Sequence, residues 1–248
     1  MDLQVISLYN LSLAFIPVAI TLFILYRWSL DAANALYAVV RMLVQLLLIG
    51  YLLAYIFAAD NTAIIFIVLS VMIVASSWIA LGPVRKQRKR LFKYAFVSIL
   101  IGGATVLALM TQGVLVIDPW YQAQAMIPLA GMIFANSMNS VSLAAERLTA
   151  EIKRGGSYDD ARVTALQSSL IPVINSLFAV GLVSLPGMMT GQILSGVSPL
   201  VAARYQIMVM CMVFGSAGIS TAVFLTLTRT AFCEIYRDRI EQKSDQEI

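Results

Sequence analysis

Seven apolar stretches, each about as long as a lipid bilayer is thick, constrain the fold of this chain more than any other feature. A membrane-spanning helix needs roughly 20 consecutive apolar residues. The stretches of that length cover residues 5–26, 35–57, 63–81, 94–115, 125–145, 165–185 and 200–227. Only 12% of the residues are charged, whereas soluble domains carry about 25%. The sequence therefore predicts an all-α, polytopic membrane protein with about seven transmembrane helices.

Short connections join these stretches, so we expect a single transmembrane domain over residues 1–248, ending in a short polar tail from 229 to 248. No basic segment precedes the first stretch and no small-residue cleavage motif follows it, which favours a retained helix over a signal peptide. The chain has no histidine, and Cys211 and Cys233 are not part of a CxxC motif. Neither a disulfide framework nor a zinc site is predicted.

The basic residues indicate how the chain crosses the membrane. All 17 Lys and Arg residues except Arg41 and Arg204 fall on one side of a seven-span arrangement, and such residues concentrate on the cytoplasmic side of membrane proteins. We therefore expect the N-terminus outside and the C-terminal tail in the cytoplasm. The densest basic run, RKQRKRLFK at 85–93, is interpreted as a topology determinant beside anionic lipid headgroups, not as a nucleic-acid-binding patch.

Charged groups are nearly absent from the interior of the predicted spans. All 13 acidic residues fall in loops, at span ends or in the tail, which weakens, without excluding, a carrier that holds its coupling ion on buried carboxylates. Arg41 lies about 11 Å from the cytoplasmic end of its helix, at 1.5 Å per residue. It shares a helical face with Asn34 and Gln45. Arg41 either contacts an anion or counter-charge on a transport path or hydrogen-bonds the carbonyl groups of a kinked neighbouring helix.

Polar stripes recur on three other predicted spans. Asn136, Asn139 and Ser140 share one side of the fifth span by their i, i+3, i+4 spacing. In the sixth span Pro172 removes the backbone donor of the helix at that point, and the seventh span carries Gln206. These faces either hold helices together or line a cavity.

The segment LPGMMTGQILSGVSP, residues 185–199, interrupts the apolar pattern with two prolines and three glycines. Irregular backbone at membrane depth is tolerated only inside protein or beside water. This segment is therefore either an outer loop or a partly re-entrant segment that shapes a pathway.

Three segments resemble the FetB-type permease family, the membrane subunits of bacterial iron-export ABC transporters, whose plant relatives are linked to aluminium tolerance. They are RMLVQLLLIGYLLAYIF (41–57), IPLAGMIFANSMNSVSLAAERL (127–148) and VGLVSLPGMMTGQILSGVSPLVAARYQIMVM (180–210). The most specific part is LPGMMTG followed by YQI. The resemblance covers nearly the whole chain, although Ala135 stands where relatives have a glycine and the loop after the fifth span matches loosely.

The resemblance implies a multi-pass permease in the bacterial inner (plasma) membrane that exports iron. It also implies that two permeases form a homodimer and assemble with two separate ABC ATPase subunits. The chain contains no GxxxxGK[ST] P-loop, so ATP and Mg²⁺ would bind the partner ATPase, and we expect neither enzymatic activity nor a cofactor in this chain. Membrane lipid is the other expected partner, and no nucleic acid is expected.

Two groups of candidate site residues follow. The predicted translocation path combines polar stripes with motif positions of the family: Arg41, Gln45, Asn136, Met138, Asn139, Met188, Met189 and Gln206. The predicted ATPase contact lies in residues 151–166, where Gly155 and Gly156 break the chain, Ser157 can cap a helix and acidic residues favour the positive N-terminal end of that helix. The contact residues there are Tyr158, Asp159, Arg162 and Val163.

The transported substrate is the least constrained property. Iron is usually bound by imidazole, carboxylate or thiolate, and the predicted interior offers only Cys211, so no metal ligands are assigned. The substrate is therefore left open among an iron ion, a chelate, a metabolite and a lipid-like cargo. The alternative function is an ion-coupled secondary transporter of a small metabolite. A membrane-embedded enzyme is disfavoured, because no nucleophile–base or metal-ligand set is present.

Overall fold

The computed structural model describes residues 7–58 and 61–232 of the chain. In these residues the fold is helical, and no β-strand forms apart from an isolated bridge between Val180 and Ser184. The chain divides into two compact units, residues 1–60 and residues 61–248. The all-α fold class predicted from the sequence is confirmed.

The first unit contains three helices, α1 (Leu8–Leu13), α2 (Phe15–Arg27) and α3 (Ala32–Ala58). The Ser7 side chain caps α1 by accepting a hydrogen bond from the backbone N–H of Asn10 at 3.2 Å. Two segments of this unit, Leu8–Arg27 and Ala32–Leu53, are long and apolar enough to cross a membrane. No residue of α1 or α2, all of which the structure describes, is buried.

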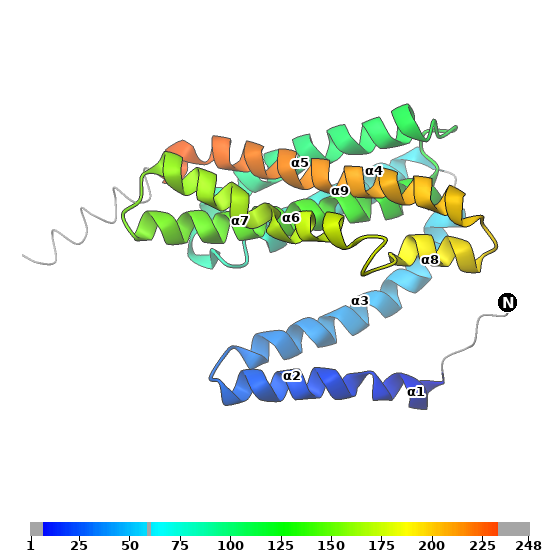
Figure 1. Ribbon diagram of the computed structural model, residues 1–248, viewed down its shortest axis with the longest axis horizontal. Coiled ribbons are helices and arrows are strands. Elements are labelled where there is room, and N and C mark those ends of the chain that lie inside the picture. Colours follow the sequence, from blue (N-terminus) through cyan, green and yellow to red (C-terminus); the bar gives the residue numbers. More distant parts are fainter. Residues whose placement is uncertain (1–6, 59–60, 233–248) are drawn as a thin grey trace, which may run out of the picture. The chain divides into compact units, whose positions relative to one another are not determined.

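The second unit is a helical bundle (Figure 1). Its helices are α4 (Thr62–Ala80), α5 (Arg88–Ala108), α6 (Ala123–Lys153), α7 (Tyr158–Ala179), α8 (Gly187–Leu194) and α9 (Pro199–Leu227). A 3₁₀ turn, Arg85–Gln87, precedes α5, and a π-helical turn, Leu109–Val114, follows it. Helix α9 packs against α5, α6 and α7, and α6 also packs against α4, α5 and α7. The core of the unit therefore lies around α6 and α9.

A close helix approach holds the middle of this bundle together. A Cβ atom added to Gly102 of α5 would lie 2.3 Å from the Ser220 Oγ atom and 2.7 Å from the Ser220 backbone nitrogen. A Cβ atom on Gly103 would lie 2.6 Å from the Phe134 ring of α6. Small residues let helix backbones approach in this way, and the resulting van der Waals contacts drive helix association in membranes. Fully buried Val141 and Phe224 extend the same core.

Five helical segments in the described residues are long and apolar enough to span a membrane: Leu8–Arg27, Ala32–Leu53, Thr62–Ala80, Arg85–Val114 and Pro199–Leu227. These segments agree with five of the seven predicted spans. The other two predicted spans, 125–145 and 165–185, fall largely within α6 and α7, which have 31 and 22 residues but a more polar composition. The seven-span count and the orientation of the termini therefore stay predictions.

The structure also refines where the helices end. Helix α6 continues through Lys153, eight residues past the predicted span end at 145. Gly155, whose φ of +90° is a left-handed conformation that glycine adopts easily, then reverses the chain. The sequence correctly predicted this break and the cap that follows, because Ser157 accepts a hydrogen bond from the backbone N–H of Asp160 at 3.2 Å. Within 185–199, residues Gly187–Leu194 form the short helix α8.

Candidate functional site

The predicted path residues lie in both units. Arg41 and Gln45 are on α3 of the first unit, four residues apart and both exposed. The other predicted path residues belong to α6, α8 and α9 of the second unit. That residues of α3 and of the second unit line one shared path therefore stays a prediction.

The two asparagines of α6 differ in their surroundings. The Asn136 Nδ2 atom donates a hydrogen bond to the Met132 carbonyl at 2.8 Å, so this half-buried amide is bonded within its own helix. Asn139, nearly one turn further along, is exposed, whereas Met138 packs against the core. In a bilayer an exposed amide without partners is costly, because lipid offers no hydrogen bonds. Asn139 therefore needs water or another protein surface to satisfy its amide.

Three serines join α6 to α9 at the level of these asparagines. The Ser137 hydroxyl donates to the Ser216 carbonyl at 3.3 Å, and the Ser220 hydroxyl donates to the Ser137 Oγ atom at 3.1 Å. All three serines are fully buried. These bonds hold α6 to α9. They involve neither Asn136 nor Asn139, so both alternatives for the stripe of Asn136, Asn139 and Ser140, cavity lining or helix contact, stay predictions. The partners of Ser137 could not be found from spacing alone.

Gln206 lies at a different level of α9. Only 6% of Gln206 is exposed, and its Oε1 atom has no hydrogen-bond partner among the described residues. Ser216, which bonds α6 at Ser137, comes ten residues later, roughly 15 Å along the helix axis at 1.5 Å per residue. Gln206 is thus well separated along the bundle from Asn139. A path lined by both amides must therefore extend along the helices instead of forming one compact cavity.

The two methionines of the LPGMMTG motif begin helix α8. Met188 and Met189 are half-buried, and Met188 packs against the core. Helix α8 contacts α9. Because α8 and the start of α9 form consecutive helices joined by residues 195–198, the methionines and Gln206 belong to the same end of the bundle. The structure thus groups Gln206 with α8 by position and Asn139 with the serine junction.

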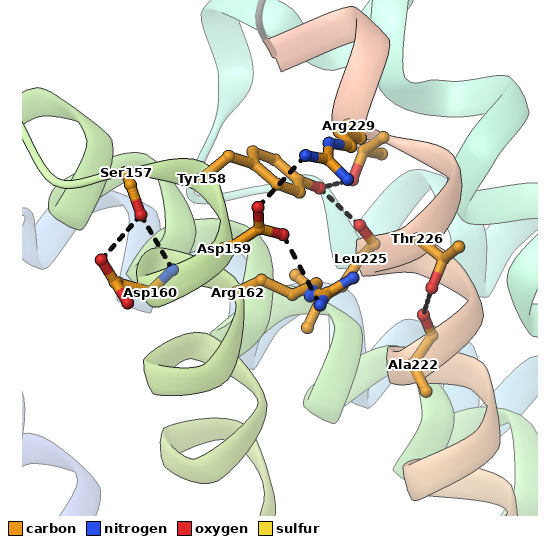
Figure 2. Close-up of polar contacts among 10 residues, drawn as sticks. Ser157, Tyr158, Asp159, Asp160, Arg162, Ala222, Leu225, Thr226 and Arg229 are labelled. Carbon is orange, nitrogen blue, oxygen red and sulfur yellow. Dashed lines mark hydrogen bonds and ion pairs between the residues drawn. The ribbon is translucent and has the colours of Figure 1, made fainter.

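Three of the predicted ATPase-contact residues, Tyr158, Asp159 and Arg162, lie where α7 meets the end of α9 (Figure 2). The Tyr158 hydroxyl donates a hydrogen bond to the Leu225 carbonyl and lies 3.3 Å from the Thr228 hydroxyl. Leu225 is one of the last four residues of α9, whose carbonyl groups lack a donor within the helix. Tyr158 therefore satisfies an end of α9 and ties it to the first turn of α7.

Asp159 forms two ion pairs, one with Arg229 just after α9 and one with Arg162 in its own helix α7. Its carboxylate lies 3.1 Å from the Arg229 guanidinium and 3.6 Å from the Arg162 guanidinium. These side chains are 40–59% exposed, so each pair contributes only about 0–1 kcal/mol to stability. The Arg229 guanidinium also lies 5.9 Å from the centre of the Tyr158 ring. Together these contacts orient the start of α7 relative to the end of α9.

Val163 differs from the other three predicted contact residues. It is 52% exposed, whereas Tyr158 is largely covered by α9. Val163 lies about one helical turn after Asp159. Val163 is therefore an exposed apolar side chain next to paired charges, and it is free to pack against another protein. The sequence predicted Tyr158 and Val163 alike as contact residues and gave no sign of the hydrogen bond that joins Tyr158 to Leu225.

Among the described residues, no group of three or more His, Cys, Asp or Glu side chains could hold a metal ion. Cys211 is a free, exposed thiol, while Cys233 lies outside the residues that the structure describes.

Comparison with known proteins supplies the family. The family model described as "Uncharacterised protein family (UPF0014)" matches residues 8–233. The chain is 38% identical over 210 residues to "UPF0014 membrane protein slr1647" from Synechocystis sp., covering 77% of this chain and 80% of that protein. It is 31% identical over 243 residues to "Probable iron export permease protein FetB" from Escherichia coli, covering 90% of this chain and 91% of that protein.

A plant protein is also similar. "Protein ALUMINUM SENSITIVE 3" from Arabidopsis thaliana is 32% identical over 237 residues, covering 89% of this chain and 83% of that protein. No solved structure matches the chain. The apolar helices and these relatives define a multi-pass membrane protein of the permease class. The chain belongs to the family UPF0014, which confirms the resemblance to FetB-type permeases stated from its sequence.

Proposed function

We propose that this chain is the permease subunit of an ABC transporter that exports iron from the cytoplasm. The similarity to the E. coli protein named as an iron export permease, over 90% of this chain, carries the proposal. In this proposal the chain crosses the bacterial inner membrane seven times with its N-terminus outside, because nearly all of its basic residues then face the cytoplasm. A separate ATPase binds ATP and Mg²⁺ and powers transport.

The turn between α6 and α7 is the proposed ATPase contact. A docked ATPase can move the membrane helices only through a rigid connecting element. Tyr158 and Asp159 stiffen this turn because they tie the start of α7 to the end of α9. Val163 stands open beside them. We infer that Val163 and the rim residue Arg162 contact the ATPase, while Tyr158 and Asp159 pass its motion on to α9.

The exposed polar faces of α6 and α7 support a homodimer. Asn139 of α6 and Gln167 and Asn175 of α7 are all exposed, although lipid cannot satisfy their hydrogen bonds. A second copy of the chain that brings such faces together would enclose a polar path between the two permeases. Two ATPases would then serve two permeases.

The ATPase contact is tested by charge substitution. Val163→Asp places a carboxylate in the proposed interface and should reduce co-purification of the ATPase at least tenfold, because an unpaired buried charge is strongly unfavourable. Lys89→Asp serves as the control, since Lys89 is exposed on the α4–α5 side of the bundle. Normal ATPase binding by Val163→Asp together with loss of binding by Lys89→Asp would move the contact to residues 82–93.

Topology is tested by cysteine labelling in a variant that lacks Cys211 and Cys233. Lys89 and Gln122 are both exposed. Lys89 lies at the start of the span Arg85–Val114, and Gln122, the N-cap residue of α6, lies in the connection that follows this span. A cysteine at 122 should react with an impermeant thiol reagent added to intact cells, whereas a cysteine at 89 should react only after the membrane is opened. The reverse pattern would contradict the proposed orientation.

The alternative is an ion-coupled secondary transporter of a small metabolite, in which the chain works without an ATPase. Transport that needs ATP hydrolysis and survives a proton ionophore supports the ABC permease. Transport by this chain alone, abolished by the ionophore, supports the carrier.

A further inference from the structure

A cavity of about 640 Å³ lies where the α4–α5 turn meets the last turns of α6. Its lining includes none of the predicted path residues and none of the contact residues Tyr158, Asp159, Arg162 and Val163, although Lys153 belongs to the 151–166 segment. Its lining comes from two parts of the chain about 65 residues apart. The residues are Gly82, Pro83, Val84, Arg85, Lys86, Gln87, Thr149 and Lys153.

Positive charge dominates this cavity. Arg85, Lys86 and Lys153 contribute three cationic side chains to the lining, and among the residues that the structure describes no acidic side chain contributes to it. The ammonium groups of Lys86 and Lys153 have no ion-pair partner within the described parts of the chain. Gln87 is the N-cap residue of α5 and makes no side-chain cap bond. Because the N-terminus of a helix is the positive end of its dipole, α5 adds positive potential near Gln87. The cavity therefore favours an anion.

Gln87 adds a second and more specific requirement. Only 8% of Gln87 is exposed, and its Oε1 atom has no hydrogen-bond partner among the residues that the structure describes. A buried acceptor left without a donor is costly. A simple phosphodiester satisfies the cations but offers no hydrogen to this oxygen. The cavity therefore fits an occupant that combines negative charge with a hydrogen-bond donor.

The cavity lies at a membrane surface. It sits on the turn between α4 and α5, both of which belong to candidate membrane spans. At the same end of these helices the Arg88 guanidinium stacks 4.0 Å from the centre of the Trp78 ring and donates to the Trp78 carbonyl. Trp residues concentrate at the level of lipid headgroups. Basic pockets between membrane helices at this level are suited to the headgroups of anionic lipids.

We propose that this cavity binds the headgroup of an anionic phospholipid that carries a hydroxyl group, with phosphatidylglycerol as the fitting chemistry. The phosphate lies between Lys86 and Lys153, and a glycerol hydroxyl donates to the Gln87 Oε1 atom. The ammonium of an ethanolamine headgroup also donates hydrogen bonds, but three cations in the lining repel it. Inorganic phosphate with a protonated oxygen has the same chemistry, so the experiment separates the two sources.

The test measures lipid binding by the purified full-length chain with native mass spectrometry, during titration with phosphatidylglycerol or phosphatidylcholine. The double variant Lys86→Gln/Lys153→Gln should bind phosphatidylglycerol about 25-fold more weakly, at about fivefold for each lysine. The matched control Lys89→Gln/Lys93→Gln removes the same charge from exposed lysines outside the cavity and should stay within about twofold of wild type. Gln87→Leu removes the carboxamide, and with it the Oε1 acceptor, without changing the charge, and should weaken binding about fivefold.

Equal weakening in the double variant and in its control would overturn the proposal, because general surface charge would then explain binding. Equal binding of phosphatidylcholine and phosphatidylglycerol by the wild type would overturn it as well. Displacement of the lipid by excess inorganic phosphate would assign the cavity to a soluble anion instead. Normal lipid binding by the double variant with loss of ATPase co-purification would assign it to the protein partner. Circular dichroism checks that each variant keeps its helix content.

Discussion

The two units of this chain are both apolar enough for a membrane, but they differ in how many of their side chains are buried. In residues 1–60, α1 and α2 contain no buried residue within the described chain, and α3 carries Arg41 and Gln45 on its exposed surface. In residues 61–248, the α5, α6 and α9 helices approach closely enough that Gly102 has no room for a Cβ atom. The difference teaches that hydropathy indicates membrane residence, whereas small and hydroxyl-bearing residues indicate which helices pack.

The largest expected effect contrasts one glycine from each unit. Gly102→Ala places a Cβ atom 2.3 Å from the Ser220 Oγ atom and 2.7 Å from its backbone nitrogen, so the two helices must separate. We expect a loss of about 3 kcal/mol in the free energy of unfolding, at the upper end of typical overpacking costs. The measurement is thermal unfolding of the purified variant in a mild detergent.

Gly50→Ala is the matched control for Gly102→Ala. No atom lies within 4 Å of a Cβ added to Gly50, and alanine favours a helix over glycine by up to about 1 kcal/mol. Gly50→Ala should therefore keep or raise the unfolding temperature. A large loss at Gly50 would instead show that α3 is closely covered by another helix, and the contrast between the two units would not hold.

The next effect concerns the tie between α7 and α9. Tyr158→Phe removes the hydroxyl that donates to the Leu225 carbonyl and leaves that carbonyl at the end of α9 without this donor. The expected loss is about 1–2 kcal/mol in the free energy of unfolding. If the tie also transmits motion, ATP hydrolysis by the complex should continue while transport per ATP falls. Unchanged transport per ATP would leave Tyr158 with a structural role alone.

A smaller effect is expected at the serine junction. Ser137→Ala removes hydrogen bonds to Ser216 and Ser220, and a hydrogen bond between membrane helices contributes about 0.6 kcal/mol on average. A loss of about 1 kcal/mol or less in the free energy of unfolding is therefore expected. A loss as large as that of Gly102→Ala would show that the hydroxyl groups, not the close backbone approach, hold these helices together.

Asn139→Leu should leave the free energy of unfolding within about 0.5 kcal/mol of wild type, since substitutions at exposed sites usually have small effects. Transport should fall because the path loses an amide, and Asn139→Gln should restore part of it. Failure of Asn139→Leu to form a complex would instead make Asn139 part of the contact between two copies.

Local features of the structure followed from the sequence more readily than long-range ones. The Gly155 turn and the Ser157 cap were predicted because glycine conformation and N-capping depend on neighbouring residues. Five spans agree because length and apolarity suffice to recognise them. The contact of Gly102 with Ser220 could not be predicted, because it joins helices more than a hundred residues apart and spacing within one helix carries no information about its partner.

The candidate site shows the same limit. The prediction that Tyr158 and Asp159 contact an ATPase stays a prediction, and their bonds to Leu225 and Arg229 could not be predicted because they depend on how α7 and α9 pack. The separation of Gln206 from Asn139 along the bundle became visible only through the register that Ser137 sets against α9. The basic cavity could not be predicted either, because it forms only where the end of α6 packs beside the α4–α5 turn.

Iron uptake by inside-out membrane vesicles tests the central claim most directly. Vesicles should contain this chain and a candidate ABC ATPase together, or either chain alone, with ATP supplied outside. The proposed export permease predicts that iron accumulates in the vesicles only when both chains and ATP are present, and that a proton ionophore does not abolish the uptake. Iron uptake by vesicles that contain this chain alone, without ATP and abolished by the ionophore, would contradict the proposal that an ATPase powers this permease.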